Sequence, residues 1–230
     1  MKNVQEEIRE IRTQLRLAMN GVTSTSMRER GIVYKLNFGV PYPEIKEIAR
    51  THEPDAELAA ALWREDIREF KILASFLQPA ETFSLEEARR WVREIPYLEI
   101  AEHCSRNLFF RLPYMEDFVS GLLSDTEYPF ARTVAFLVCA EHLKHEGRLE
   151  DTLQVLFLME SMRTIASDPA NVTLKEKQAA IQSLKFYGRQ SESQATEILG
   201  GFDALKRRFE AEPELREIYN ELKFEFEYYR

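Results

Sequence analysis

The sequence has few residues that break or cross-link a chain: eight glycines, nine prolines and two cysteines among 230 residues. This composition leaves little to interrupt long periodic segments and favours a mostly helical protein. Cys104 and Cys139 both lie in helix-like patterns, and no other feature suggests an oxidising compartment. We therefore expect two reduced, buried thiols.

Long apolar runs are also missing. The segment MKNVQEEIREIRTQLRLAMNG at the start of the sequence is charged throughout and has no apolar core of the signal-peptide type. No stretch approaches the ~20 apolar residues that a membrane span requires. These two absences predict a cytoplasmic protein without membrane contact.

Positive charge is in the minority. The formal net charge of −8 argues against indiscriminate binding to polyanions, because an acidic surface repels them. A local basic groove remains compatible with this balance, since salt limits the reach of distant charges to about 8 Å.

What is present is helical periodicity from end to end. An amphipathic first helix is predicted over residues 2–19, followed by a polar connection, VTSTS, and a helix that begins around Pro43. Further helices are predicted near 55–64, 66–78, 84–94, 97–110, 115–123, 128–145, 148–166, 173–188, 192–208 and 213–229. No alternating strand-like run appears, so sheet content should be near zero.

Long apolar helices recur every thirty to forty-odd residues, near residues 66, 97, 130 and 175. Such a repeat is typical of stacked helical pairs. The predicted fold is an all-α solenoid of HEAT-like repeats, an α-α superhelix forming a single domain over residues 1–230. A compact helical bundle is the alternative.

A basic flank runs along the helical segment ELAAALWREDIREFKILASFL, where Arg64, Arg68, Lys71 and Ser75 follow one another at three- and four-residue spacing. Trp63 and other apolar residues form the adjoining face. Two readings are open for this flank: an ordinary solvated helix face, which the pattern favours, or part of a surface that meets an anion such as a nucleic-acid backbone.

Arg132 stands at the start of an apolar helix, in SDTEYPFARTVAFLVCAEHL. Asp125 or Thr126 could cap this helix, and Pro129 suits its first turn. A cation near a helix N-terminus opposes the helix dipole, so Arg132 needs a partner. That partner is either a neighbouring glutamate, in a structural salt bridge, or a phosphate in a groove.

Metal-binding and nucleophilic motifs are poorly represented. His142 and His145 lie three residues apart, but no other Cys or His cluster completes a metal site. His103 and Cys104 are adjacent, and neighbours on a helix point about 100° apart, so they cannot form a dyad. We expect no metal and no cofactor.

Four segments in order resemble the DNA alkylation repair family, the HEAT-like alkylpurine DNA glycosylases. They are FGVPYPEIKEIAR, ELAAALWREDIREFKILASFL, SDTEYPFARTVAFL and KQAAIQSLKFYGRQ. The resemblance covers about residues 27–190. It implies a concave basic cradle for duplex DNA and excision of purines alkylated at N3 or N7.

Such excision needs a carboxylate to stabilise an oxocarbenium-like transition state, together with aromatic surfaces for the cationic nucleotide. The resemblance places Arg132 at the position of the family's backbone-anchoring arginine. Glu102 is the candidate catalytic carboxylate, in EIAEHCSRNLFF. The predicted DNA-binding residues are Arg64, Arg68, Lys71, Arg106 and Arg132.

The same helix lacks the tryptophan and aspartate of the family's best-characterised branch. Three functions therefore stay open. The protein could bind DNA without excision, act on another lesion through Glu102, or serve as a scaffold that binds a protein partner along a helical-repeat surface.

Overall fold

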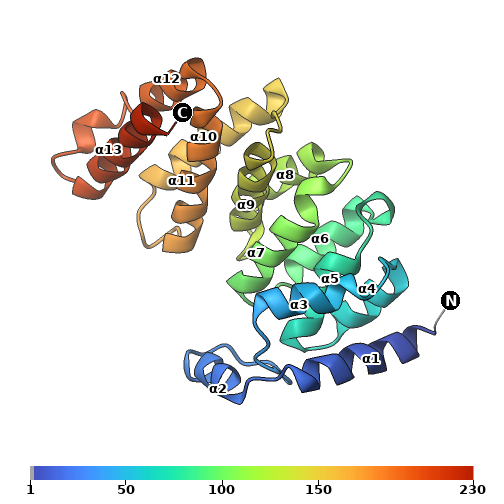
Figure 1. Ribbon diagram of the computed structural model, residues 1–230. Coiled ribbons are helices and arrows are strands. Elements are labelled where there is room, and N and C mark those ends of the chain that lie inside the picture. Colours follow the sequence, from blue (N-terminus) through green and yellow to red (C-terminus); the bar gives the residue numbers. More distant parts are fainter. Residues whose placement is uncertain (1–2, 230) are drawn as a thin grey trace. The chain divides into compact units, whose positions relative to one another are not determined.

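The computed structural model describes residues 3–229, so residue 2, at which the predicted first helix begins, lies outside this range. The chain divides into two compact units, Met1–Pro113 and Tyr114–Arg230. Every regular element in the described residues is helical, apart from one isolated bridge between Leu36 and Ile67. The all-α prediction is confirmed (Figure 1).

The first unit contains seven α-helices and two short 3-10 turns within the described residues. Their bounds are α1 Val4–Leu17, α2 Gly21–Glu29, α3 Tyr42–Arg50, α4 Ala56–Arg64, α5 Arg68–Leu77, η1 Ala80–Thr82, α6 Leu85–Arg93, α7 Leu98–Asn107 and η2 Phe109–Arg111. Helix α5 packs against α3, α4 and α7, and all its residues except Phe76 are buried. It is therefore the central helix of this unit.

The second unit is built around α9 and α11, which pack against each other. Its described elements are α8 Met115–Leu123, α9 Ala131–Lys144, α10 Asp151–Ala166, α11 Leu174–Arg189, α12 Glu192–Gly201, η3 Lys206–Arg208 and α13 Pro213–Tyr228. Consecutive helices pair as α8 with α9, α10 with α11 and α11 with α12. Such pairing is the arrangement predicted from the repeated apolar helices.

The polar connection VTSTS is not a loop but part of α2, which corrects the prediction. Asn20 precedes the helix, and its side chain accepts a hydrogen bond from the Thr23 backbone N–H. Ser24 Oγ donates to the Asn37 carbonyl oxygen at 2.8 Å. One capping side chain and one tertiary hydrogen bond thus stabilise a helix whose threonines have low helix propensity.

Several other helix boundaries differ from the prediction: α7 ends at Asn107 and α10 begins at Asp151, each three residues inside the predicted range. The helix expected over 192–208 ends at Gly201, the second of two consecutive glycines. Helix α9 begins at Ala131, preceded by Phe130 without a side-chain cap. Asp125 instead accepts from the backbone N–H groups of Glu127 and Tyr128, which shapes the turn before the helix.

Trp63 and Trp91 form the aromatic core of the first unit. Their rings stack with centroids 4.0 Å apart, and both residues are buried. Cys104 and Cys139 are buried free thiols. Burial raises the pKa of both thiols well above the ordinary value, which keeps them protonated.

Candidate nucleic-acid interface

The segment FGVPYPE leads into α3, and two side chains of α5 hold its backbone in place. Glu69, which is fully buried, accepts hydrogen bonds from the backbone N–H groups of Phe38 and Val40 at 3.1 and 3.2 Å. Arg68 Nη1 donates to the Val40 carbonyl oxygen at 2.9 Å. Between them Gly39 has φ +69°, and a Cβ there would clash with the Asn20 backbone. These contacts fix the backbone directly before Tyr42, the first residue of α3.

Arg68 is also bonded to α7. Its Nε donates to Glu99 Oε2 at 2.9 Å, and its Nη2 pairs with Glu99 Oε1. Burial alone would raise the Glu99 pKa, but His103 and Arg68 together lower it to about 2. The carboxylate is thus held ionised.

Lys71 is buried against Trp63. Its Nζ donates to the Trp63 carbonyl oxygen at 2.8 Å and lies 4.5 Å from the centroid of the Trp63 ring. Burial lowers the Lys71 pKa below its ordinary value. Both readings of the basic flank placed Arg68 and Lys71 at the surface, and this expectation is wrong because both side chains are buried and bonded within the unit. Only Arg64, at the end of α4, is exposed.

An aromatic stack joins α3 to α7. The Tyr42 ring lies parallel to the His103 imidazole, with centroids 4.5 Å apart and planes 9° apart. Tyr42 Oη donates to Asn107 Oδ1 at 3.0 Å. The Arg106 guanidinium carbon lies 6.0 Å from the Tyr42 ring centroid. His103 Nδ1 is buried without a hydrogen-bond partner among the described residues.

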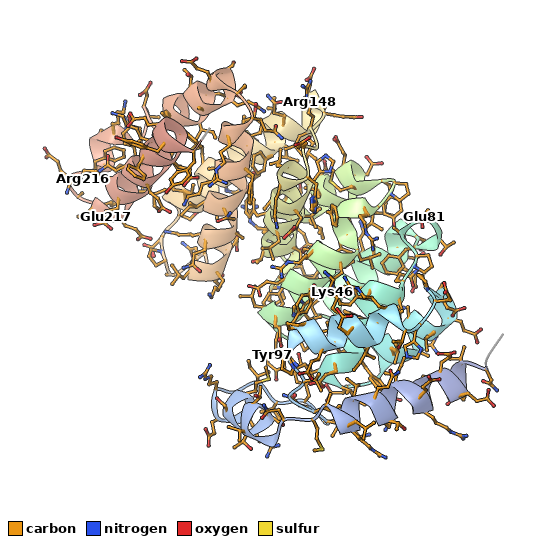
Figure 2. The ribbon with its side chains drawn as sticks, viewed as in Figure 1. Lys46, Glu81, Tyr97, Arg148, Arg216 and Glu217 are labelled. Atoms are coloured by element: carbon orange, nitrogen blue, oxygen red, sulfur yellow. The ribbon has the colours of Figure 1, made fainter. Side chains whose placement is uncertain are left out.

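The exposed side of this stack carries charge. Glu102 and Arg106 are exposed on α7, four residues apart, and Lys46 is exposed on α3 one turn after Tyr42. Figure 2 labels Lys46 on α3. It also labels Tyr97, a residue outside this group, whose hydroxyl donates to the Val33 carbonyl oxygen at 2.8 Å. We call Tyr42, Lys46, Glu102 and Arg106 the α3–α7 surface; His103 is buried against Tyr42.

Arg132 lies in the second unit, where four groups of the protein accept its hydrogen bonds. Its Nε donates to Glu176 and one Nη1 hydrogen to Glu160, each at 2.8 Å. Thr164 Oγ1 and the Leu123 carbonyl oxygen accept the others, both at 2.6 Å. Burial would lower the Arg132 pKa, but Glu176 and Glu160 raise it above its ordinary value.

The salt-bridge reading of Arg132 therefore describes this structure. Arg132 links α9 to the end of α8, to α10 and to α11, and two carboxylates balance its charge. A hollow of about 360 Å³ lies beside it, lined by residues that include Tyr128, Arg163, Asn171 and Thr173. A phosphate at this position would compete with both glutamates for the guanidinium.

A sequence model described as "DNA alkylation repair enzyme" matches residues 11–165. The chain belongs to this family. No curated protein sequence gives a significant match. One similar solved structure is described as "A new family of proteins related to the HEAT-like repeat DNA glycosylases with affinity for branched DNA structures". It is 14% identical, with a TM-score of 0.68, over 84% of this chain and 82% of that one.

The DNA alkylation repair resemblance drawn from the motifs is thus confirmed, and the similar structure confirms the HEAT-like helical fold. No described helix is long and apolar enough to cross a membrane. No cluster of three or more His, Cys, Asp and Glu suited to a metal ion occurs in residues 3–229.

Sequence reasoning missed Tyr42 and the stacking role of His103. Tyr42 stood in the quoted family motif, directly after Pro41, so its position could have drawn attention to it. His103 was considered only with Cys104. Its stacking partner is 61 residues away in the chain and could not be identified from local spacing.

Proposed function

We propose that this member of the DNA alkylation repair family binds DNA and that the α3–α7 surface forms part of the contact. The observation that carries the proposal is the Tyr42–His103 stack with Arg106 beside it and Lys46 one turn away. Because the Tyr42 ring stacks against both His103 and Phe76, the exposed cations Lys46 and Arg106 are the groups that would contact DNA, through its phosphates.

Family membership supports DNA as the ligand, and the similar structure with affinity for branched DNA makes branched DNA a ligand worth testing. Arg64 and Arg106 are the exposed members of the predicted DNA-binding set. Arg68 and Lys71 are buried and have structural roles. Arg68 fixes the loop before α3, and Lys71 fixes the end of α4.

Glycosylase action is the second candidate function. It is favoured by the exposed carboxylate of Glu102, one turn from Arg106 on the helix that also carries His103. A carboxylate at such a place could stabilise positive charge developing on the sugar as an alkylated purine departs. In this proposal Tyr42, the half-buried ring of the stack, would contact the cationic nucleotide.

The experiment is a fluorescence anisotropy titration with three DNAs of equal length: an intact duplex, a duplex containing an abasic site, and a four-way junction. We expect binding that weakens between about 50 and about 200 mM salt, with a log-log slope of about −0.9 per phosphate contacted. Absence of binding to all three at the lowest salt would overturn the proposal and leave the protein-binding scaffold as the remaining reading.

A further inference from the structure

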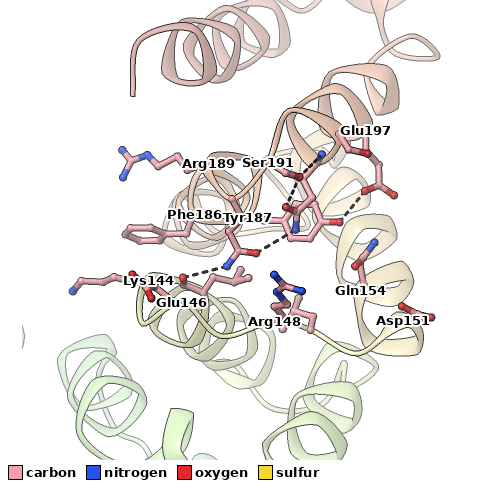
Figure 3. A pocket seen from close by; sticks show the side chains of 15 residues that line it. Lys144, Glu146, Arg148, Asp151, Gln154, Phe186, Tyr187, Arg189, Ser191 and Glu197 are labelled. Carbon is pink, nitrogen blue, oxygen red and sulfur yellow. Dashed lines mark hydrogen bonds between the residues drawn. The ribbon is translucent and has the colours of Figure 1, made fainter. Parts of the chain in front are cut away.

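A second surface, in the unit Tyr114–Arg230, combines an open hollow with exposed aromatic rings. The hollow has a volume of about 870 Å³ and lies where the ends of α9 and α11 meet the starts of α10 and α12 (Figure 3). Its lining includes two aromatic residues, Phe186 and Tyr187, and three cations, Lys144, Arg148 and Arg189. None of these residues belongs to the α3–α7 surface.

Arg148 presents its guanidinium to the hollow. Its backbone is held in place, since its carbonyl oxygen lies 3.1 Å from His142 Nε2. Its side chain is exposed and has no hydrogen bond or ion pair with the described residues. Figure 3 shows it among the side chains that line the hollow. The backbone of Arg148 is therefore fixed, while its guanidinium is accessible to a ligand.

Three exposed aromatic residues stand at the end of α13, beside the end of α11. Phe224, Tyr228 and Tyr229 are 53, 68 and 57% exposed. The ring centroids of Phe224 and Tyr228 are 4.5 Å apart, and those of Phe224 and Tyr229 are 6.3 Å apart. These rings form one cluster, although each would be buried in an ordinary core.

Arg189 connects the cluster to the hollow. Its guanidinium carbon lies 5.4 Å from the Phe186 ring centroid and 5.9 Å from that of Tyr229. Glu225 accepts its Nε hydrogen bond at 2.7 Å, which fixes the guanidinium between the two rings. Aromatic rings and cations thus run from Phe186 through Arg189 to Tyr229, Phe224 and Tyr228, and Arg148 lines the same hollow as Phe186. We call this set, Lys144, Arg148, Phe186, Arg189, Phe224, Tyr228 and Tyr229, the α11–α13 surface.

We infer that the α11–α13 surface binds unpaired nucleotides of single-stranded or branched DNA. Bases stack on the exposed rings, and Arg148 and Lys144 meet the phosphates beside them. The hollow is lined by Glu146, Asp151 and Glu197 as well as by its three cations, so its formal charge is balanced. Stacking on rings does not require net charge, whereas binding driven by phosphate contacts does.

The phosphate contacts of Arg148 and Lys144 predict a salt response. Single-stranded DNA should bind here with a log-log slope of about −0.7 per phosphate contacted, compared with about −0.9 for a duplex on the α3–α7 surface. The inference shares with the proposed function only that the ligand is DNA. Because the residues differ, either surface can fail without the other.

The test is anisotropy of a fluorescein-labelled oligothymidylate, which does not pair with itself. We expect Tyr228→Ala and Tyr229→Ala each to weaken its binding at least about fivefold, because stacking on one ring is lost. Tyr228→Phe keeps the ring and should bind as the wild type does. Arg148→Gln should weaken binding and reduce the salt slope by about 1.

Leu174→Ala is the matched control, since Leu174 is an equally exposed apolar side chain in the first turn of α11. It should leave oligothymidylate binding unchanged, and circular dichroism should show that all variants are folded. Oligothymidylate binding that is unaffected by Tyr228→Ala, Tyr229→Ala and Arg148→Gln would overturn the inference. Self-association in sedimentation velocity that Tyr228→Ala abolishes, with no effect on oligothymidylate binding, would also overturn it in favour of an interface between two copies.

Discussion

The Tyr42 ring stacks on the His103 imidazole, and the Tyr42 hydroxyl donates a hydrogen bond to Asn107 Oδ1. One side chain of α3 therefore contacts two residues of α7. This relationship brings together residues more than sixty positions apart in the chain. It also places an aromatic face beside the exposed cation Arg106. The DNA-binding proposal depends on this arrangement.

Arg132 should act as a structural clamp. Arg132→Ala would leave Glu176 without a cation and Glu160 with only the exposed Arg163, in a mostly buried site, and breaking such a pair typically costs about 3–5 kcal/mol of unfolding free energy. Urea denaturation would measure this loss. Arg163→Ala is the control, because Arg163 contacts the same Glu160 from an exposed position and should cost less than about 1 kcal/mol. Lost DNA affinity at unchanged stability would instead assign Arg132 to a phosphate.

Glu99 should make the stability of the protein depend on acid pH. Its pKa is lowered to about 2 in the folded protein, below the value of about 4.5 expected when unfolded, so ionised Glu99 favours the folded state. Its contribution is complete above pH 4.5 and is lost as the pH falls towards 2. Glu99→Gln should therefore be less stable than the wild type at neutral pH. The two proteins should converge in unfolding free energy at low pH, and a constant difference would contradict the argument.

Gly39 should tolerate no side chain. Its φ of +69° is in the left-handed region, and a Cβ would lie 2.8 Å from the Ser24 backbone nitrogen and closer still to the Asn20 carbonyl oxygen. Gly39→Ala should lower the melting temperature markedly, since the backbone strain alone costs about 1–3 kcal/mol. Gly200→Ala should raise stability by about 0.5–1 kcal/mol, because Gly200 is helical with open space around it.

Glu102 should be required for any base excision. If the protein releases 3-methyladenine or 7-methylguanine from methylated DNA, Glu102→Gln should abolish release while keeping DNA affinity within a few-fold of the wild type. Glu116→Gln, a carboxylate change on α8, should release bases normally. Full activity of Glu102→Gln would show that another carboxylate is responsible. No release by the wild type would restrict the protein to DNA binding.

Much of the fold follows from local sequence. The apolar periodicity around Trp63, Trp91 and Val134 predicts helices and a core, and the structure buries all three. Helix formation depends on apolar residues spaced three and four positions apart, and this spacing can be read directly from the sequence.

The fate of the basic flank does not follow from local sequence. Arg68 is buried because Glu99, thirty-one residues later, accepts its hydrogen bonds, and because it reaches the backbone of Val40. Lys71 is buried because its side chain packs against Trp63, which the sequence places on the apolar face. A charged residue next to an apolar face reads as solvated unless its distant partner is known. For the same reason the Tyr42–His103 contact could not be found from spacing.

The proposal that the α3–α7 surface binds DNA is tested most directly by comparing Arg106→Ala with Arg89→Ala in duplex and four-way-junction binding. Both are exposed arginines of the same unit, Arg106 beside Tyr42 and Arg89 on α6. We predict that Arg106→Ala weakens DNA binding and reduces the salt slope by about 1, while Arg89→Ala binds as the wild type does. Equal effects of the two substitutions, or no effect of Arg106→Ala, would contradict the assignment of DNA binding to the α3–α7 surface.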